Sequence, residues 1–158
     1  MALKFVSTMN ELELLNSEFT EGKELPIFEG LRAGFPSPAA DYEQQTLDFN
    51  RDFIKHPEAT FYGRVKGDSM RNAGIHEGDI LVVDKSAEIA HGDVVVAYFN
   101  REFTIKFLDT THREEGWMEL VPANPEFKRI HIDVNDEFAI WGKVIFTIKD
   151  WRSARCMQ

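Results

Sequence analysis

The chain has 158 residues, 43% of them hydrophobic, which is enough for one domain with a core and a short appendage. Its 27 acidic and 18 basic residues give a formal net charge of -9 at pH 7, so the field of the whole molecule repels phosphate and disfavours direct DNA binding. A single cysteine, Cys156, excludes a fold held by intramolecular disulfides, and no apolar run is long enough to cross a bilayer. We therefore expect a cytoplasmic protein that does not bind membranes.

The first forty residues differ in composition and hydrophobic pattern from the rest of the chain. They contain short apolar clusters and an acidic stretch at 11–13, without a helical period sustained beyond a turn or two. We interpret residues 1–40 as a flexible N-terminal arm and residues 41–158 as the folded domain. Near the end of the arm, two prolines hold the backbone extended, and the peptide between Ala33 and Gly34 carries almost no side-chain bulk. A protease cleft can accept such a segment.

A short helix and then a series of strands are expected after the arm. Apolar residues between Asp41 and His56 have a weak helical spacing, which ends at Pro57. From Thr60 onward, β-branched and aromatic runs alternate with glycine, asparagine and aspartate, a pattern typical of a compact all-β domain. A hairpin turn is predicted at residues 100–101, although arginine is a poor residue for positive φ and the loop can be longer than two residues. The expected strands are 60–65, 79–84, 94–99, 102–107, 117–122, 130–134 and 138–149.

A serine lies in a tight turn directly after the first of these strands. The turn reads Gly67, Asp68, Ser69 and Met70. Glycine permits such a turn, and the backbone N–H groups exposed around Ser69 are what an oxyanion hole requires, with the flanking residues as support. Because a serine hydroxyl is a weak nucleophile without a base to take its proton, the chain must also supply that base.

A lysine within a predicted strand is the candidate base. Lys106 lies between two apolar residues, and strict alternation places it on the same face as Thr104 and Leu108. A lysine acts as a base only when neutral, and at an ordinary pKa of about 10.4 fewer than roughly one in a thousand is neutral at pH 7. Lowering that pKa to about 7 costs on the order of 4 to 5 kcal/mol, which burial can supply. We expect a resting state with Lys106 solvated and charged, activated when the cleft closes and expels water.

Each of these features also has a purely structural interpretation. A Gly-Asp-Ser turn is usually only a turn, and a strand lysine usually faces solvent. Other catalytic groupings are weaker, because the five histidines lie beside glycine turns or lack the spacing of metal ligands. The aspartates at 68, 79 and 93 are typical of turns and caps. We expect no metal and no cofactor.

The segments described above occur in the order and spacing of a known family. Residues 33–42 contain the small-residue peptide, 67–70 the serine turn and 102–106 the lysine strand, and further pieces lie at 78–79, 91–95, 122–124 and 142–144. Together they closely resemble the LexA/UmuD family of self-cleaving serine-lysine peptidases, over roughly residues 33 to 149. UmuD has cysteine before the scissile glycine, whereas alanine, as at position 33, is the LexA pattern.

The resemblance implies a curved, mainly antiparallel β catalytic domain in a homodimer. It implies Ser69 as nucleophile, Lys106 as general base and Ala33–Gly34 as the bond that the protein cuts in itself. In this family a RecA filament on single-stranded DNA stimulates the cut, and the shortened dimer joins a UmuC-type translesion polymerase in the SOS response. LexA-type repressors also carry a helix-turn-helix of about sixty residues, which the residues before the cut cannot house.

Alternatives remain open on the sequence alone. The chain could act as a non-catalytic dimeric adaptor for a polymerase and RecA, or correspond to a repressor-type peptidase domain without its DNA-binding part. A third alternative is that the chain is a protease that cuts other proteins in trans. Intact Ser69 and Lys106 favour catalysis, because an adaptor has no need to bury a lysine beside a serine.

Overall fold

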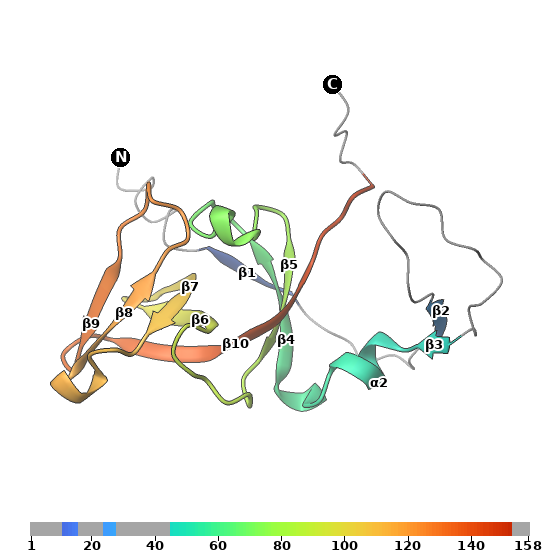
Figure 1. Cartoon of the computed structure of the whole chain (residues 1–158), viewed down its shortest axis with the longest axis horizontal. Helices are drawn as coiled ribbons and strands as arrows, with labels where there is room; N and C mark the ends of the chain where they lie inside the picture. Colours follow the sequence, from blue (N-terminus) through green and yellow to red (C-terminus); the bar gives the residue numbers. More distant parts are fainter. Residues whose placement is uncertain (1–10, 16–23, 28–44, 153–158) are drawn as a thin grey trace, which may run out of the picture. The chain divides into compact units, whose positions relative to one another are not determined.

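An antiparallel sheet, curled into a half-barrel, dominates the computed structural model, which describes residues 11–15, 24–27 and 45–152 (Figure 1). Its strands run in the order β1-β4-β5-β10-β6-β7-β8-β9. The bounds are β1 Leu12–Leu15, β4 Thr60–Val65, β5 Ile80–Asp84, β6 Val94–Phe99, β7 Glu102–Asp109, β8 Trp117–Val121, β9 Ile130–Asp133 and β10 Phe138–Ile148. The expected mainly β, curved antiparallel fold is confirmed.

The strands predicted from residue 60 onward match the observed ones to within two residues at either end. The two-residue hairpin between β6 and β7 is also confirmed, since Phe99 pairs with Glu102 across it. Both turn residues have positive φ, 48° at Asn100 and 71° at Arg101, so the arginine accepts an unfavourable conformation that this turn requires. Short 3₁₀ turns precede β4 at Pro57–Ala59, connect β4 to β5 at Arg71–Ala73 and connect β7 to β8 at Arg113–Glu115.

The expected short helix is confirmed, and it occupies only the later part of the segment 41–56. Helix α2 spans only Phe49–Phe53, capped by the Asp48 carboxylate, which accepts from the backbone N–H groups of Asn50 and Arg51. Residues 45–47 form strand β3 instead, paired with β2, Leu25–Ile27. Pairing to a distant segment therefore outcompetes the weak helical spacing there. These elements belong to a second compact unit, and residues 41–44 lie outside the described residues.

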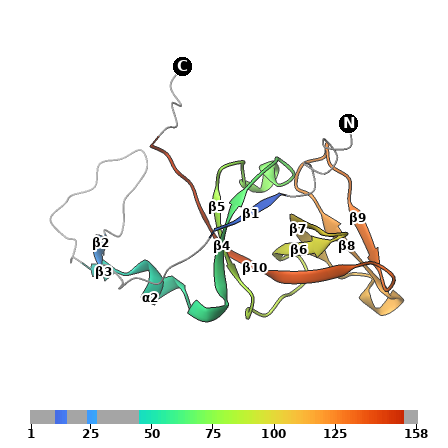
Figure 2. The same ribbon diagram turned by 180° about the vertical axis from the view of Figure 1, so that it is seen from behind.

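The sheet buries side chains on both of its faces. Val96 of β6 belongs to one apolar cluster, while its neighbours Val95 and Ala97 belong to another, as the alternation of a strand dictates. Figures 1 and 2 show the long β10 crossing the sheet, and it pairs with β5 through its second half and with β6 through its first. No helix among the described residues is long and apolar enough to span a membrane.

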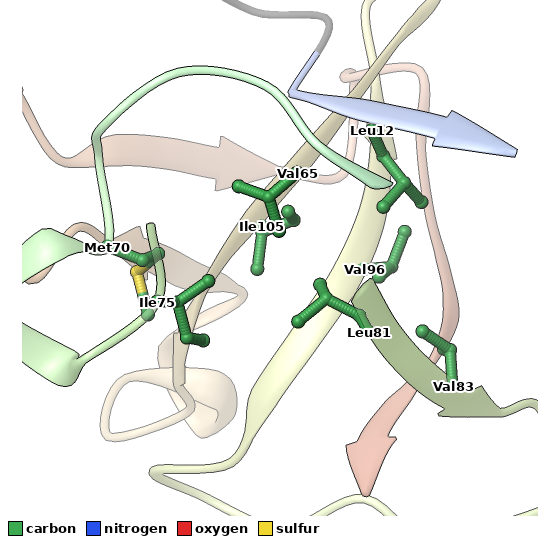
Figure 3. Close-up of a cluster of buried hydrophobic side chains, with 8 residues drawn as sticks. All are labelled: Leu12, Val65, Met70, Ile75, Leu81, Val83, Val96 and Ile105. Atoms are coloured by element: carbon green, nitrogen blue, oxygen red, sulfur yellow. The ribbon is translucent and has the colours of Figure 1, made fainter. Parts of the chain in front are cut away.

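Strand β1 is a structural element that the sequence did not predict. Four residues from the expected arm pair with β4 along its outer edge, from Leu12 opposite Val65 to Leu15 opposite Tyr62. Leu12 points into the first apolar cluster beside Leu81 and Val96 (Figure 3). The segment LELL is too short and too acidic to indicate a strand by itself, so the pairing with β4 determines its conformation.

Candidate active site

Ser69 lies in the loop between β4 and the 3₁₀ turn that starts at Arg71. The loop turns at Gly67, whose φ of 87° is readily adopted only by glycine. Asn124, fully buried, holds the loop from the far side: its backbone N–H donates to the Ser69 carbonyl at 2.9 Å and its Nδ2 donates to the Asp68 carbonyl at 3.0 Å. Asn124 therefore holds the peptide groups before and after Ser69, and only 3% of Ser69 is exposed.

Lys106 comes from the middle of β7, paired opposite Val95 of β6. Its Nζ donates to the Oγ of Ser69 at 2.8 Å, although the two residues are 37 positions apart in the sequence. Lys106 is 3% exposed. The expected resting state, with this lysine solvated, is therefore wrong for the described structure: Lys106 is already buried against the serine.

Two groups of β7 itself also accept hydrogen bonds from the Lys106 ammonium. Nζ donates to the Oγ1 of Thr104 at 2.7 Å and to the carbonyl of Ile105 at 3.1 Å. The contact with Thr104 confirms that positions 104 and 106 share a face of the strand. Alternation along the strand predicts that Thr104 lies beside Lys106, but nothing in the sequence pattern indicates its hydrogen-bonding role.

The remaining partner of Lys106 is Glu11, a residue of the expected N-terminal arm. Lys106 Nζ and the Oε2 of Glu11 form an ion pair at 2.6 Å, and Glu11 is 2% exposed. Burial lowers the pKa of Lys106 below its ordinary range, and the Glu11 carboxylate opposes that shift through its charge and hydrogen bond. No sequence signal identifies this pair, because its members lie 95 residues apart.

The other predicted site residues take different places. Met70 packs in the core beneath the loop, and the Asp68 carboxylate accepts from Arg71 at 2.9 Å, so its side chain serves the turn. Ala33 and Gly34 lie outside the described residues. Within the described ranges, no group of three or more histidine, cysteine, aspartate or glutamate side chains is placed to hold a metal ion.

This arrangement places a hydroxyl beside an amine whose pKa is lowered by burial. Such an amine can take the proton of the hydroxyl once it is neutral, which is what a serine nucleophile needs. In the described state the amine is instead held by a carboxylate, and the cavity at Ser69 leaves no space for a water molecule. Ser69 and Lys106 are therefore in hydrogen-bond contact inside a closed cavity.

Comparison with known proteins places the chain in a family. A profile described as Peptidase S24-like matches residues 26–145. Protein MucA of Salmonella typhimurium is 43% identical over 119 residues, covering 75% of this chain and 79% of MucA. Protein SamA of Salmonella typhimurium is 43% identical over 129 residues, covering 81% of this chain and 87% of SamA. The LexA repressor of Bordetella petrii is 38% identical over 126 residues, which cover 79% of this chain but 54% of the repressor. The chain therefore belongs to the peptidase S24-like family, in agreement with its resemblance to UmuD and LexA.

Proposed function

We propose that this protein is a serine endopeptidase that cuts its own chain between Ala33 and Gly34, with Ser69 as nucleophile and Lys106 as general base. The observation that carries the proposal is the 2.8 Å contact between Lys106 Nζ and Ser69 Oγ, both buried. Membership of the peptidase S24-like family supports it independently. In this proposal residues 1–40 form the arm that is cut, and residues 41–158 form the peptidase and dimerisation domain.

The reaction follows from the chemistry of the two side chains. Neutral Lys106 takes the Ser69 proton as Oγ bonds to the carbonyl carbon of Ala33, and the negative charge passes to the carbonyl oxygen. N–H groups of the turn around Ser69 are the candidate donors to that oxyanion. When the Ala33–Gly34 bond breaks, the Lys106 ammonium gives its proton to the amine of Gly34. Water then attacks the ester and passes a proton to Lys106. When the ester bond breaks, the Ala33 carboxylic acid leaves and Lys106 gives that proton to Ser69 Oγ, which restores both side chains.

We propose that the cut serves DNA-damage tolerance. In this role a RecA filament on single-stranded DNA stimulates cleavage in the cytoplasm, and the shortened homodimer becomes an accessory subunit of a UmuC-type error-prone translesion polymerase. The cleavage-region and active-site resemblance to UmuD, together with 43% identity to MucA and SamA, supports this role. A net charge of -9 agrees with partners that are proteins rather than DNA.

The test is incubation of the purified protein at neutral pH with RecA, nucleotide and single-stranded DNA, followed by intact-mass analysis. The Ser69→Ala variant and a reaction without DNA are the controls. The proposal predicts a product beginning at Gly34 only in the complete reaction with wild-type protein. If wild-type protein stays whole under this condition and also without RecA at high pH, the chain acts as a non-catalytic adaptor instead.

A further inference from the structure

Glu11 is inserted between two strands of the peptidase sheet. Its backbone N–H donates to the Phe103 carbonyl of β7 at 2.9 Å, and its carbonyl accepts from the Lys66 N–H after β4 at 2.8 Å. From Leu12 onward the segment continues as β1 along the edge of β4. An extended peptide that adds a strand to a sheet edge in this way is a common mode of peptide binding.

The side chains of this segment occupy two distinct places. The Glu11 carboxylate reaches the active site, where its Oε2 accepts from Thr104 Oγ1 at 2.8 Å, from Ile105 N–H at 3.0 Å and from Lys106 Nζ. Leu12 enters the apolar cluster, 3% exposed (Figure 3). Glu13 points outward and is half exposed, with its carboxylate 3.6 Å from the Lys66 ammonium. The site therefore fits an acidic residue followed by leucine.

While this segment is bound, the nucleophile is closed off. Glu11 is one of the residues that line the cavity at Ser69, together with the loop at 65–67, Met70 and Ile105, and no water molecule fits inside it. A scissile carbonyl has to come within bonding distance of Ser69 Oγ, so it needs the space that the Glu11 side chain fills. Binding of Glu11 and binding of the substrate peptide exclude each other.

The Glu11 carboxylate is also only partly hydrogen-bonded. Oε1 of Glu11 is buried and has no hydrogen-bond partner among the described residues, whereas Oε2 accepts three hydrogen bonds. A buried carboxylate oxygen without a partner is costly, so part of the favourable interaction with Lys106 is offset. Such a segment is suited to reversible release. Its departure also removes the charge that opposes the lowered pKa of Lys106.

We propose that the β4 edge and the cavity at Ser69 form a binding site for an extended Glu-Leu peptide, and that residues 11–15 occupy it as an inhibitor built into the chain. The inhibitory part of this proposal rests on the proposed peptidase function, whereas binding of residues 11–15 at the sheet edge does not depend on it. Activation is the withdrawal of this segment, which frees the base and the cleft together. Since residues 11–15 precede the scissile bond, the cut separates the inhibitor covalently from the peptidase.

The experiment compares three full-length proteins: wild type, Glu11→Gln and the matched control Glu13→Gln, which changes the same charge on the outward face. Self-cleavage is followed at neutral pH by intact mass. Glu11→Gln is expected to cut at least about tenfold faster, the effect of lowering the Lys106 pKa by one unit, and Glu13→Gln at the wild-type rate.

The same two changes in an uncleavable Ser69→Ala background are examined by amide hydrogen exchange. There, Glu11→Gln is expected to raise exchange in residues 11–15, and Glu13→Gln to leave it unchanged.

The two readouts separate this inference from the proposed function. If wild type cuts but Glu11→Gln is no faster, the inference is overturned and the peptidase stands. If Glu11→Gln abolishes cutting while Glu13→Gln does not, Glu11 is a positioning residue for Lys106 rather than an inhibitor. If no protein cuts under any condition, the peptidase fails, and hydrogen exchange alone decides whether Glu11 holds the segment on the sheet.

Discussion

A Cβ atom at position 63 would lie only 2.7 Å from the Cγ of Leu12, so Leu12 can pack where it does only because residue 63 is glycine. Gly63 belongs to β4, and Leu12 begins β1. The N-terminal segment and the peptidase sheet are therefore matched in shape as well as in charge, at a point that touches neither Ser69 nor Lys106.

Gly63→Ala is expected to displace Leu12 and weaken the binding of β1. Because burial of one leucine is worth about 1.5 to 3 kcal/mol, the free energy of unfolding should fall by up to that amount. Leu12→Ala removes the clashing atoms, so Gly63→Ala should cost less than about 1 kcal/mol in that background. Urea unfolding of the four proteins in a Ser69→Ala background measures this coupling. Additive effects would mean that the two side chains do not compete for space.

The buried ion pair predicts that removing the charge of Lys106 alone costs more stability than removing the charges of both Lys106 and Glu11. If only the desolvation of Lys106 mattered, Lys106→Met would leave the free energy of unfolding unchanged or raise it. Here, however, the substitution leaves the Glu11 carboxylate buried without a cation. Breaking a buried pair from one side costs about 3 to 5 kcal/mol, an upper limit because the segment can instead leave the sheet. Glu11→Gln with Lys106→Met should restore stability to within about 1 kcal/mol of the Ser69→Ala background. Equal melting temperatures for the single and double variants would contradict the pairing.

The lowered pKa of Lys106 predicts how stability depends on pH. Between its folded-state pKa and the ordinary value of 10.5, the unfolded chain binds more protons than the folded one. The contribution of this residue to stability should therefore rise as pH increases through that window, by at most about 1.4 kcal/mol per pH unit. It is read as the difference in unfolding free energy between Ser69→Ala and the same protein with Glu11→Gln and Lys106→Met. A difference that falls toward alkaline pH would show that the folded-state pKa is raised instead.

Asn124 should affect the position of Ser69 without touching Lys106. Asn124→Ala removes the hydrogen bond to the Asp68 carbonyl and the one that Oδ1 accepts from the Glu126 N–H at 3.0 Å. Unsatisfied buried groups cost about 1 to 3 kcal/mol, so stability should fall by that order. The cleavage rate at high pH should fall while its pH midpoint stays unchanged, because the base is untouched. Asn135→Ala, at an exposed turn, is the control, and a shifted midpoint in Asn124→Ala would contradict this positioning role.

The strands, the turn at Ser69 and the strand position of Lys106 could be predicted because their signals are local. Alternation along 102–107 indicates which side chains share a face, and glycine with aspartate indicates where strands end. The family resemblance then supplied the expectation that Ser69 and Lys106 meet, which residue spacing alone does not.

Glu11, strand β1 and the contacts of Asn124 could not be predicted in the same way. Each depends on contacts between residues far apart in the sequence, such as Asn124 with the loop at 67–70. The short helix expected within 41–56 forms only toward the end of that segment for a related reason, since pairing with β2 takes residues 45–47 into a strand. The assignment of Ala33–Gly34 as the scissile bond lies outside the described residues and stays a prediction.

The central claim is that Ser69 and Lys106 cut the chain at Ala33–Gly34, and the most direct test needs no partner. Wild type, Ser69→Ala and Lys106→Ala are incubated alone at about pH 10, where an ordinary lysine begins to lose its proton, and their intact masses are measured. We predict that wild type alone splits into two fragments, the larger beginning at Gly34. An uncut wild type, a cut at another bond, or the same cut in either variant would contradict the claim.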